Sequence, residues 1–446
     1  MRKQIHRPVL LERLPDRVLA LLRAIGQLGD ERGCQVYVVG GVVRDLLMGH
    51  VTLDLDLAVE GDGITFARAV ADRYRTGLAV FERFATARLV FPDMLKMDIA
   101  TTRRESYAQP ADLPTVQPAS MKEDLYRRDF TINAMAVQLN PAQFGQLLDE
   151  YGGRHDLRAR TIRVLHAGSF QDDPTRIFRA IRFEQRFKFR LERGTCRLLV
   201  QAASTNLIQQ LSGPRLQNEM LSLLGEKSAV RAIARLSQLK LLRFLHRRLC
   251  YTANVQRVVI AVPKALAWWG RRVPDGVIDK PLIYLMALSS ESSPAVVAAM
   301  IRRLALSREQ AKKVSASGRP VDRALKKLTE ARFLRPSQVY HLLVDLPDEA
   351  LVLLLAKQLV AGPSARVVRL KRYLTSYMKS RMLRIVLTGH DLQALGLQPG
   401  PQYAVVLGQL LDGRIDGVIA SEGDERDFVL KRYGRFAYRG IVSLAR

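Results

Sequence analysis

The sequence predicts an α+β protein, in which a small mixed sheet with its helices occupies about the first 150 residues and the rest of the chain is helical. Short apolar runs of strand length alternate with helical repeats as far as residue 101, which is typical of a mixed αβ unit. From residue 198 to about residue 360, apolar residues recur at helical spacing instead. The length of 446 residues allows two to four domains.

The chain is strongly basic, with 70 lysines and arginines against 43 aspartates and glutamates and a net charge of +27. Such an excess favours a polyanionic partner. We find no apolar run of about 18 residues and no signal-peptide core, so we expect no membrane association and a cytoplasmic protein. The cysteines Cys34, Cys196 and Cys250 are far apart, which predicts neither a zinc ribbon nor a disulfide framework.

The elements of the first unit follow from the spacing of its apolar residues. Val18, Leu22 and Ile25 recur at helical spacing and predict a helix over residues 10–29. A strand over residues 36–39, a Gly40-Gly41 turn and a helix over 42–47 come next. A helix at 65–74 and short strands at 78–84, 87–91 and 96–101 complete the predicted unit.

A pair of aspartates follows the glycine turn, in the run Leu53-Asp54-Leu55-Asp56-Leu57. Because strand side chains alternate between faces, we expect the aspartates on one face and the three leucines in the core. Mg²⁺ takes oxygen ligands and often only one or two carboxylates, and two such ions assist an in-line phosphoryl displacement. The alternative is a solvated strand edge without a metal.

The Gly40-Gly41 turn supplies the second part of this predicted site. Residues without a Cβ allow backbone N–H groups to approach a triphosphate closely, and the N-terminus of the following helix favours a phosphate. Asp98, on the last predicted strand, is a candidate third carboxylate that binds metal or activates the attacking hydroxyl. Its alternative is a salt bridge to a nearby arginine. Together these residues predict metal-dependent nucleotidyl transfer.

Two later stretches carry polar groups suited to a nucleotide. Residues 103–118 contain three prolines and predict a long loop near the site. Within residues 123–136, Arg127, Arg128, Asp129 and Asn133 offer guanidinium and amide groups for phosphates and ribose hydroxyls. The alternative for this second stretch is a charged helix start.

The stretch from Ser169 to Phe183 begins a helix at Asp172-Asp173-Pro174. Asp173 and Arg176 are three residues apart and share a helix face. Cytosine and adenine both present an exocyclic amine beside an unprotonated ring nitrogen, so an aspartate acceptor beside an arginine donor fits these two bases. The alternative is a capping aspartate with an exposed salt bridge.

The helical remainder is basic and carries few chemical motifs. A helix starts near Ser212, residues 366–384 form a strongly basic helix, and Thr388 begins a short capped helix. These basic faces are either solvated or an RNA-binding surface. His155-Asp156 and His390-Asp391 have no second histidine nearby, which argues against a metal phosphohydrolase.

The chain resembles the bacterial class II tRNA nucleotidyltransferases, the CCA-adding enzyme and poly(A) polymerase family of the polymerase-β-like superfamily. Gly40 to Asp45 with Asp54 and Asp56 resemble its catalytic motif, and Arg127 to Ala134 its ribose-recognition motif. Asp172 to Arg176 resemble the Glu-Asp-x-x-Arg amino-acid template, with Asp172 in place of the usual glutamate. Residues 212–219 and 388–403 resemble its neck helix and its tail.

This resemblance implies a nucleotidyltransferase head over residues 1–150, a base-selecting neck over 151–225, a body over 226–361 and a tRNA-binding tail over 362–446. It implies CTP, ATP and the tRNA 3′ end as partners and Mg²⁺ as cofactor, with Asp54 and Asp56 as metal ligands. Asp98 is expected as a further catalytic residue from its place on the predicted strand and not from the resemblance. The residues expected to bind the nucleotide are Gly40, Gly41, Arg44, Asp45, Arg128, Asp129, Asn133, Asp173, Arg176, Arg179 and Arg182.

Four functions stay open at this point. The expected one is template-independent addition of C and A to the tRNA 3′ end, with release of pyrophosphate. Relatives that add only CC or only A are a variant of it. A poly(A) polymerase is a further alternative, although a Gly-Arg-Arg-Phe signature after the catalytic motif is absent from the sequence. A noncatalytic RNA-binding protein is the last, and the intact Asp54, Asp56, Asp173 and Arg176 argue against it.

Overall fold

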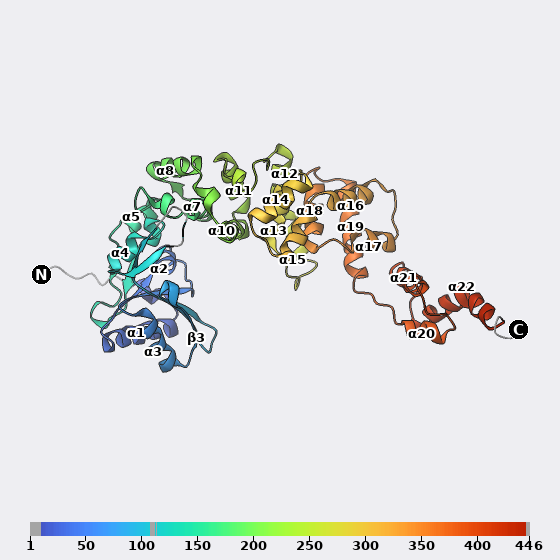
Figure 1. Cartoon of the computed structure of the whole chain (residues 1–446), viewed down its shortest axis with the longest axis horizontal. Helices are drawn as coiled ribbons and strands as arrows, with labels where there is room; N and C mark the ends of the chain where they lie inside the picture. The colour runs from blue at the N-terminus through green and yellow to red at the C-terminus, as the bar shows by residue number, and fades with distance from the viewer. Residues whose placement is uncertain (1–9, 108–111, 113, 443–446) are drawn as a thin grey trace. The chain divides into compact units, whose positions relative to one another are not determined.

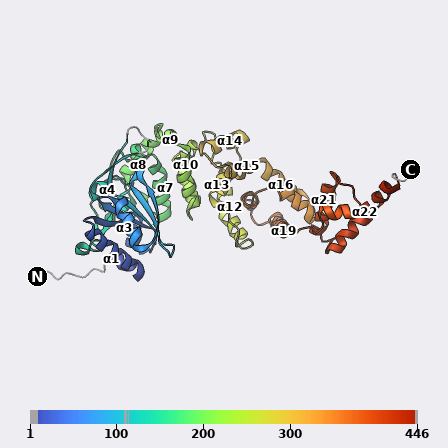
Figure 2. The ribbon, with the colours of Figure 1, turned by 60° about the horizontal axis from the view of Figure 1, so that its bottom comes forward.

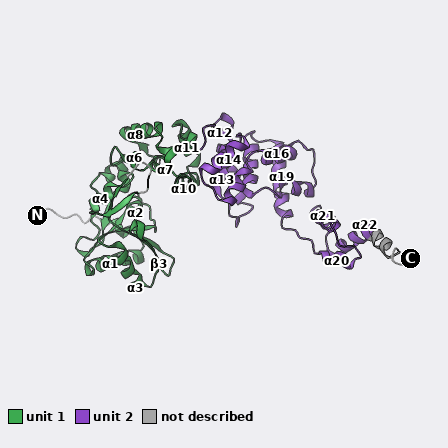
Figure 3. Cartoon of the chain, viewed as in Figure 1, with its two compact units in different colours: residues 1–244 green, residues 245–446 purple. Residues whose placement is uncertain are grey.

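The computed structural model describes residues 10–107, 112 and 114–442, with side chains as far as Tyr433. The chain divides into two compact units, residues 1–244 and 245–446 (Figure 3). Unit 1 combines a sheet with helices, and unit 2 is helical (Figure 1). The α+β class predicted from the sequence is therefore confirmed, while the finer division at residues 150, 225 and 361 stays a prediction.

The main sheet of unit 1 has seven strands in the order β3-β4-β5-β2-β1-β8-β9. The neighbours β2 and β5 are parallel, and the other neighbouring pairs are antiparallel, so the sheet is mixed as predicted. The strands are β1 (Gln35–Val39), β2 (Leu55–Glu60), β3 (Gly77–Phe81), β4 (Thr86–Val90), β5 (Lys96–Thr101), β8 (Ala136–Gln138) and β9 (Leu147–Leu148).

The two faces of this sheet are covered by different helices. One face packs against α1 (Asp16–Glu31), α2 (Gly41–Leu47) and α3 (Gly63–Tyr74), which bury the larger apolar cluster of the unit. The other face carries a smaller cluster, in which Tyr37 and Ala58 of the sheet pack with Leu125 of α4 (Met121–Tyr126). Leu55 and Leu57 point to the first face, so Asp56 between them points to the second.

The strand that carries Asp56 begins later than the sequence predicts. Leu55 is the first residue of β2 and pairs with Met97, the second residue of β5. Asp54 comes before the strand and is exposed. Leu53 was expected in the core, but its exposed fraction is 48%, and this prediction is wrong. The alternation of side chains buries a leucine only where the strand has a neighbour to pack with.

Residues 103–118 are not a structureless loop. Strands β6 (Arg103–Ser106) and β7 (Thr115–Pro118) pair antiparallel, with Arg103 opposite Pro118. The prolines in this region hid the hairpin, because proline is tolerated only at strand edges and ends. Residues 108–111 and 113 of this predicted loop lie outside the described residues.

The second half of unit 1 is helical, with one small parallel pair of strands, β10 (Thr161–Ile162) and β11 (Arg190–Leu191). Helix α7 packs against α10 and α11. The helices are α5 (Gly153–Arg158), α6 (Ser169–Asp172), α7 (Thr175–Phe187), α8 (Arg193–Ser204), α9 (Leu207–Gln210), α10 (Gly213–Gly225) and α11 (Ala229–Gln238). Short 3-10 helices occur at Leu10–Arg13, Glu82–Phe84, Thr131–Asn133, Pro141–Gln143 and Leu241–Phe244.

Unit 2 consists of helices joined by loops within the residues described, as Figure 2 shows in a second view. The helix α18 lies at its centre, because residues 349–356 are buried without interruption and α18 packs against α12, α13, α16 and α19. The helices are α12 (Ala253–Gly270), α13 (Lys280–Leu288), α14 (Pro294–Arg303), α15 (Arg308–Ser315), α16 (Arg319–Glu330), α17 (Pro336–Leu343), α18 (Asp348–Leu359), α19 (Ala365–Ser380), α20 (Gly389–Ala394), α21 (Gln402–Ile415) and α22 (Glu422–Val442).

The predicted basic helix and short capped helix of this unit are confirmed as α19 and α20. Asp391 accepts hydrogen bonds from the backbone N–H and the hydroxyl of Thr388, both at 2.8 Å, so the second His-Asp pair serves a helix cap. In the part of the chain that the structure describes, every helix is too short or too polar to cross a bilayer.

Candidate active site

The two groups of residues singled out in the sequence line one cavity of unit 1, with a volume of about 570 Å³. The turn after β1, strand β2, the segment after α4, and the helices α7 and α10 all contribute to its wall. The predicted site residues that line it are Gly40, Gly41, Arg44, Asp56, Arg128, Asp129, Asn133, Asp173, Arg176, Arg179 and Arg182. Asp45, Asp54 and Asp98 are not among its lining residues.

The lining of this cavity is predominantly cationic. Eight arginines line it against five carboxylates. Guanidinium groups bind phosphate oxygens in pairs and stay charged at all relevant pH values. The cavity therefore suits a polyanion such as a triphosphate. Three of the lining carboxylates pair with lining arginines: Glu105 with Arg127, Asp129 with Arg179 and Asp173 with Arg215.

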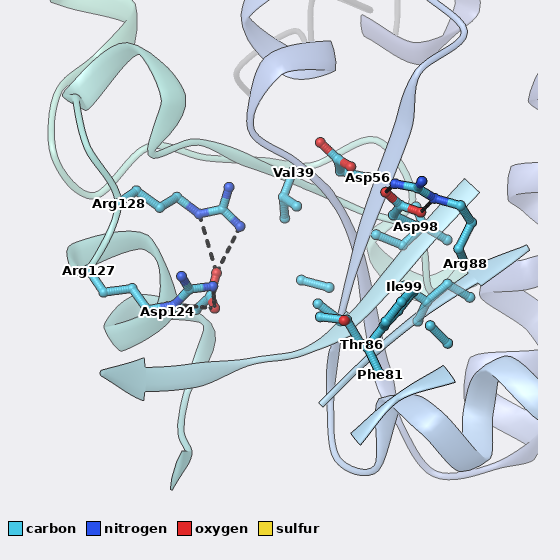
Figure 4. A pocket seen from close by; sticks show the side chains of 14 residues that line it. Val39, Asp56, Phe81, Thr86, Arg88, Asp98, Ile99, Asp124, Arg127 and Arg128 are labelled. Carbon is cyan, nitrogen blue, oxygen red and sulfur yellow. Dashed lines mark hydrogen bonds and ion pairs between the residues drawn. The ribbon is translucent and has the colours of Figure 1, made fainter. Parts of the chain in front are cut away.

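Asp56 projects from β2 beside a second, smaller cavity of about 270 Å³ on the same face of the sheet (Figure 4). Burial raises the pKa of Asp56 to about 6, and the negative charges of Asp54 and Asp98 add to this effect, against the opposing charges of Arg128 and Arg88. Within the described residues the Asp56 carboxylate has no hydrogen bond and no salt bridge. It is therefore an unpaired, half-buried acid in need of a cation.

Asp98 lies directly opposite Asp56 in the parallel pairing of β2 and β5. The Arg88 guanidinium donates two hydrogen bonds of 2.7 Å to its carboxylate, which Figure 4 shows beside Asp56. The alternative considered from the sequence, a salt bridge to a nearby arginine, is thus the arrangement found. Asp98 adds negative charge to the Asp56 environment while its own oxygens are bonded to Arg88.

The acids fit a divalent cation of the Mg²⁺ type by their chemistry. No cluster of three or more histidine, cysteine, aspartate or glutamate side chains in residues 10–107, 112 and 114–433 is arranged to hold a metal. Asp54 and Asp56 remain as a pair of oxygen donors close enough for the charge of one to raise the pKa of the other. One or two carboxylates is the number that Mg²⁺ usually takes, with water and phosphate oxygens completing its shell.

Gly40 is required by both its conformation and its surroundings. Its φ is +73°, and a Cβ at this position would lie 2.9 Å from an Arg128 nitrogen. The next helix begins at Gly41, and its Arg44 side chain is buried. Arg44 donates a 2.6 Å hydrogen bond to the Asn133 side-chain oxygen and also contacts Asp45 at 2.8 Å. The glycine turn and the predicted ribose motif are therefore directly connected.

Asp129 is the centre of the predicted ribose motif. One of its oxygens accepts from the Asn133 amide at 2.9 Å, and the other accepts from Arg179 of α7 at 2.6 and 2.8 Å. Although burial opposes ionisation, the Arg179 charge and these hydrogen bonds lower the pKa of Asp129. Asp129 is therefore ionised at neutral pH and fixes two cavity-lining side chains.

The neighbouring arginines are held by a buried acid. Asp124 of α4 pairs with Arg127 at 2.6 Å and with Arg128 at 2.8 Å, as Figure 4 shows. Glu105 of the β6–β7 hairpin holds Arg127 from the other side at 2.8 Å. The hairpin is thus tied to the cavity wall.

The predicted base-selecting pair is anchored by residues from other elements. Arg176 is buried and donates hydrogen bonds to the Ser169 hydroxyl at 2.7 Å and to the Arg127 carbonyl at 2.6 Å. One Asp173 oxygen accepts from the N–H and hydroxyl of Thr175 and from Arg215 at 2.8 Å. Within the described residues, the second Asp173 oxygen and the Arg176 Nε have no partner. They leave one acceptor and one donor for a ligand.

The start of the helix and two anchors at this pair differ from the sequence prediction or were missed by it. Helix α7 begins at Thr175, one residue later than the predicted start at Pro174. Arg215 and Ser169 were not recognised as anchors, because no spacing in the sequence connects Arg215 to Asp173, 42 residues earlier. Glu219, which was not among the predicted site residues, lines the cavity together with the predicted Arg182, and each has a buried side-chain atom without a hydrogen bond.

His155-Asp156 is structural. The buried Asp156 carboxylate accepts from the Thr131 hydroxyl at 2.7 Å and from Arg163 at 3.0 Å. This arrangement agrees with the argument against a metal phosphohydrolase.

Two family models match parts of this chain. Residues 36–163 match the family model described as "Poly A polymerase head domain", and residues 188–251 match "Probable RNA and SrmB-binding site of polymerase A". The chain belongs to the tRNA nucleotidyltransferases of this family, as its relatives show.

One relative is the A-adding tRNA nucleotidyltransferase of Geobacter sulfurreducens, 40% identical over 95% of this chain and 48% of its own length. A second is the A-adding tRNA nucleotidyltransferase of Halalkalibacterium halodurans, 32% identical over 92% of this chain and 91% of its own length. The chain thus spans about half of the first relative and nearly all of the second. A solved structure, the Thermotoga maritima CCA-adding enzyme complexed with tRNA, matches with a TM-score of 0.75 and 34% identity over 95% of this chain and 97% of its own.

Proposed function

We propose that this protein adds nucleotides to the 3′ end of tRNA from nucleoside triphosphates, with release of pyrophosphate, and that AMP from ATP is what it adds. The observation that carries the proposal is the single cavity lined both by Gly40 and Asp56 and by Asp173 and Arg176. A triphosphate and its base can occupy one such cavity together. The relatives support the reaction class, since their names describe tRNA nucleotidyltransferases.

The acids supply the reacting end of the site in this proposal. Asp54 and Asp56 would hold the divalent cations, Mg²⁺ being the expected ion, and these supply charge neutralisation and a lower pKa of the attacking 3′-hydroxyl when bound. Arg128 and Arg44 place positive charge beside the triphosphate. The hydroxyl attacks the α-phosphate, and the bond to pyrophosphate breaks.

The other end of the cavity would select the sugar and the base. Asn133 and Arg179, both fixed by Asp129, face the ribose. The unpartnered Asp173 oxygen accepts from the exocyclic amine of adenine or cytosine, and the Arg176 Nε donates to the adjacent ring nitrogen. Uracil and guanine present the opposite pattern and would leave these two groups unpaired in the complex, which costs about 1–3 kcal/mol for each group.

AMP is proposed because both relatives compared above are A-adding enzymes by name. Addition of the complete CCA sequence is the second candidate, favoured by the likeness to the Thermotoga maritima CCA-adding enzyme. Asp173 and Arg176 do not separate these two functions, because adenine and cytosine share the same donor and acceptor pattern.

The tRNA would contact basic helices in both units. In unit 2, α19 and the segment directly after α12 enclose a pocket of about 450 Å³. Its lining residues are either cationic or hydroxyl-bearing, and none is acidic: Arg272, Lys371, Arg372, Thr375, Ser376 and Lys379. Such a surface neutralises backbone phosphates without reading sequence. A cytoplasmic location is part of this proposal.

One assay tests the function. Purified protein is incubated with Mg²⁺, a tRNA transcript lacking CCA, ending in C or ending in CC, and each labelled nucleotide in turn. The expected result is one AMP on the transcript ending in CC and no C on any transcript. Three nucleotides on the shortest transcript, when CTP and ATP are supplied together, would establish CCA addition instead. Long A tracts would indicate a poly(A) polymerase, and no product under any condition would contradict the proposal.

A further inference from the structure

Another basic cavity of unit 1, distinct from the two described above, lies beyond the C-terminal end of α2, away from the Gly40 turn. Its volume is about 620 Å³, which is within the range of small-molecule sites. Residues of α5, the segment after it and the segment after α7 supply its cations, Arg154, Arg158, Arg160 and Lys188. Two aromatic rings, Phe187 and Phe189, also line it.

This cavity differs from the candidate active site in its lack of counter-charge. None of its described lining residues is acidic. In the portion of the chain covered by the structure, none of its four cationic side chains forms a salt bridge or donates a hydrogen bond. Like charges held together without acids repel one another and lower stability. An anionic ligand would remove this cost.

The cations are held on a rigid frame. Arg160 and Lys188 have φ values of +52° and +56°, a backbone conformation that side chains other than glycine seldom adopt. Arg160 immediately precedes β10, and Lys188 lies two residues before β11. In this small parallel pair, Thr161 lies opposite Arg190. The Arg190 N–H also bonds the Arg160 carbonyl at 2.9 Å. The two segments are therefore fixed side by side.

The aromatic wall separates this cavity from the active site by a single layer of side chains. The Phe187 ring stacks on Phe183 with centroids 5.7 Å apart, and the Arg44 guanidinium carbon lies 4.7 Å from its centroid. Arg44 and Phe183 line the active-site cavity, whereas Phe187 lines the cavity beyond α2. Phe189 contacts Phe187 at 5.6 Å between centroids and is half-buried.

We propose that the cavity beyond α2 binds a nucleotide, with its phosphate among Arg154, Arg158, Arg160 and Lys188 and its base against Phe189. Arginines and a lysine bind phosphate oxygens, and an aromatic ring stacks with any base without selecting among them. A free nucleotide and one nucleotide of an RNA strand present the same chemistry. The site is separate from the proposed tRNA nucleotidyl transfer and does not depend on it.

Photo-crosslinking locates the ligand and separates its two sources. The intact protein is irradiated with 4-thiouridine 5′-monophosphate or with a single-stranded RNA hexamer that contains 4-thiouridine, and adducts are mapped by mass spectrometry. Adducts within residues 154–160 or 187–189 are expected. Adducts from the mononucleotide identify a free-nucleotide site, and adducts from the hexamer alone identify an RNA contact. Absence of both from these segments would overturn the proposal.

A charge-reversal pair measures the contribution of the cations. The probe is the fluorescein-labelled form of the hexamer or mononucleotide, whichever gives adducts in these segments. Arg158→Glu/Arg160→Glu should weaken its binding by at least about tenfold at low salt, because two phosphate contacts are lost. The matched control Arg193→Glu/Arg197→Glu makes the same change in net charge on the exposed face of α8. Its affinity should stay within twofold of the unchanged protein. Equal affinities for both pairs would contradict the assignment.

Two further variants keep the outcome interpretable. Phe189→Ser retains every charge and should weaken the same probe about three- to tenfold through lost stacking. Asp56→Ala alters the candidate active site and should leave the adducts at residues 154–160 or 187–189 in place. This nucleotide site and the proposed tRNA reaction can therefore fail independently of each other.

Discussion

The arginines of the candidate active site and the two lysines of helix α19 differ in how they are held. In the active-site cavity, Arg128 and Arg179 are bonded to buried acids, and Arg176 to a hydroxyl and a carbonyl. On α19, the Lys371 and Lys379 side chains have no hydrogen bond or salt bridge within the described residues. Fixed guanidinium groups can select one ligand geometry, whereas free ammonium groups follow any phosphate backbone. The difference predicts chemical selectivity in unit 1 and salt-dependent affinity in unit 2.

The largest expected effect comes from the acids. Asp54→Ala and Asp56→Ala should each lower nucleotide incorporation roughly a thousandfold or more, because these two carboxylates are the only protein ligands predicted for the metal ions. Binding of tRNA should stay within twofold, since the basic surfaces are unchanged. Single-turnover incorporation and a filter-binding assay measure the two quantities. Asp72→Ala, which changes an exposed acid of α3, is the matched control and should behave as the unchanged protein.

The second prediction concerns Asp129, whose charge fixes Arg179 and Asn133. Asp129→Asn leaves Arg179 partly buried without its acid and should lower the free energy of unfolding by about 3 kcal/mol. Because the pKa of Asp129 is lowered in the folded protein, its contribution is complete above the ordinary aspartate pKa of about 4 and is lost as pH falls below it. Urea unfolding between pH 3 and 7 should show a flatter dependence for the variant. An unchanged slope would contradict the assigned role.

The third prediction tests selection by a fixed guanidinium. Arg176→Ala should chiefly relax base choice, lowering the preference for ATP over UTP and GTP by about ten- to a hundredfold, because wrong bases no longer leave a buried donor unpaired. Incorporation of each nucleotide under kcat/KM conditions measures this. An equal loss of rate with all four nucleotides would show that Arg176 supports the fold of the site and does not select the base.

Gly40, Asp56, Asp173 and Arg176 were found in the sequence because local rules encode them. Side-chain alternation placed Asp56, a turn required Gly40, and a helix start placed Asp173 beside Arg176, while family resemblance connected them. The same alternation failed at Leu53, since the pairing with β5 starts only at Leu55. Local rules do not reveal how far a neighbouring strand extends.

The supporting contacts could not be predicted, because they join distant segments. Arg215 reaches Asp173 from α10, and Glu105 reaches Arg127 from a hairpin whose prolines disguised it. Nothing in the spacing of these residues specifies such pairs. The predicted chemistry was therefore available from the sequence, whereas the positioning of that chemistry came from the structure.

The fourth prediction concerns the free cations of unit 2. Lys371→Glu/Lys379→Glu should weaken tRNA binding about tenfold and reduce the salt dependence of the binding constant, because two phosphate contacts are lost. The rate at saturating tRNA should be unchanged. Lys264→Glu/Lys326→Glu, with the same charge change at exposed positions of α12 and α16, is the control. Equal weakening by both pairs would mean that net charge alone, and not the α19 pocket, determines affinity.

The smallest expected effect tests whether anchoring of the guanidinium matters by itself. Ser169 is fully buried and its hydroxyl accepts from Arg176 at 2.7 Å, so Ser169→Ala removes one anchor and keeps the arginine. Base selectivity should fall about three- to tenfold, less than for Arg176→Ala, because the Arg127 carbonyl still holds the other nitrogen. Ser169→Thr retains the hydroxyl and should recover most of the selectivity if the added methyl group is accommodated. A loss of overall rate with selectivity intact would mean that the anchor stabilises α6 and α7 and does not orient the base-selecting group.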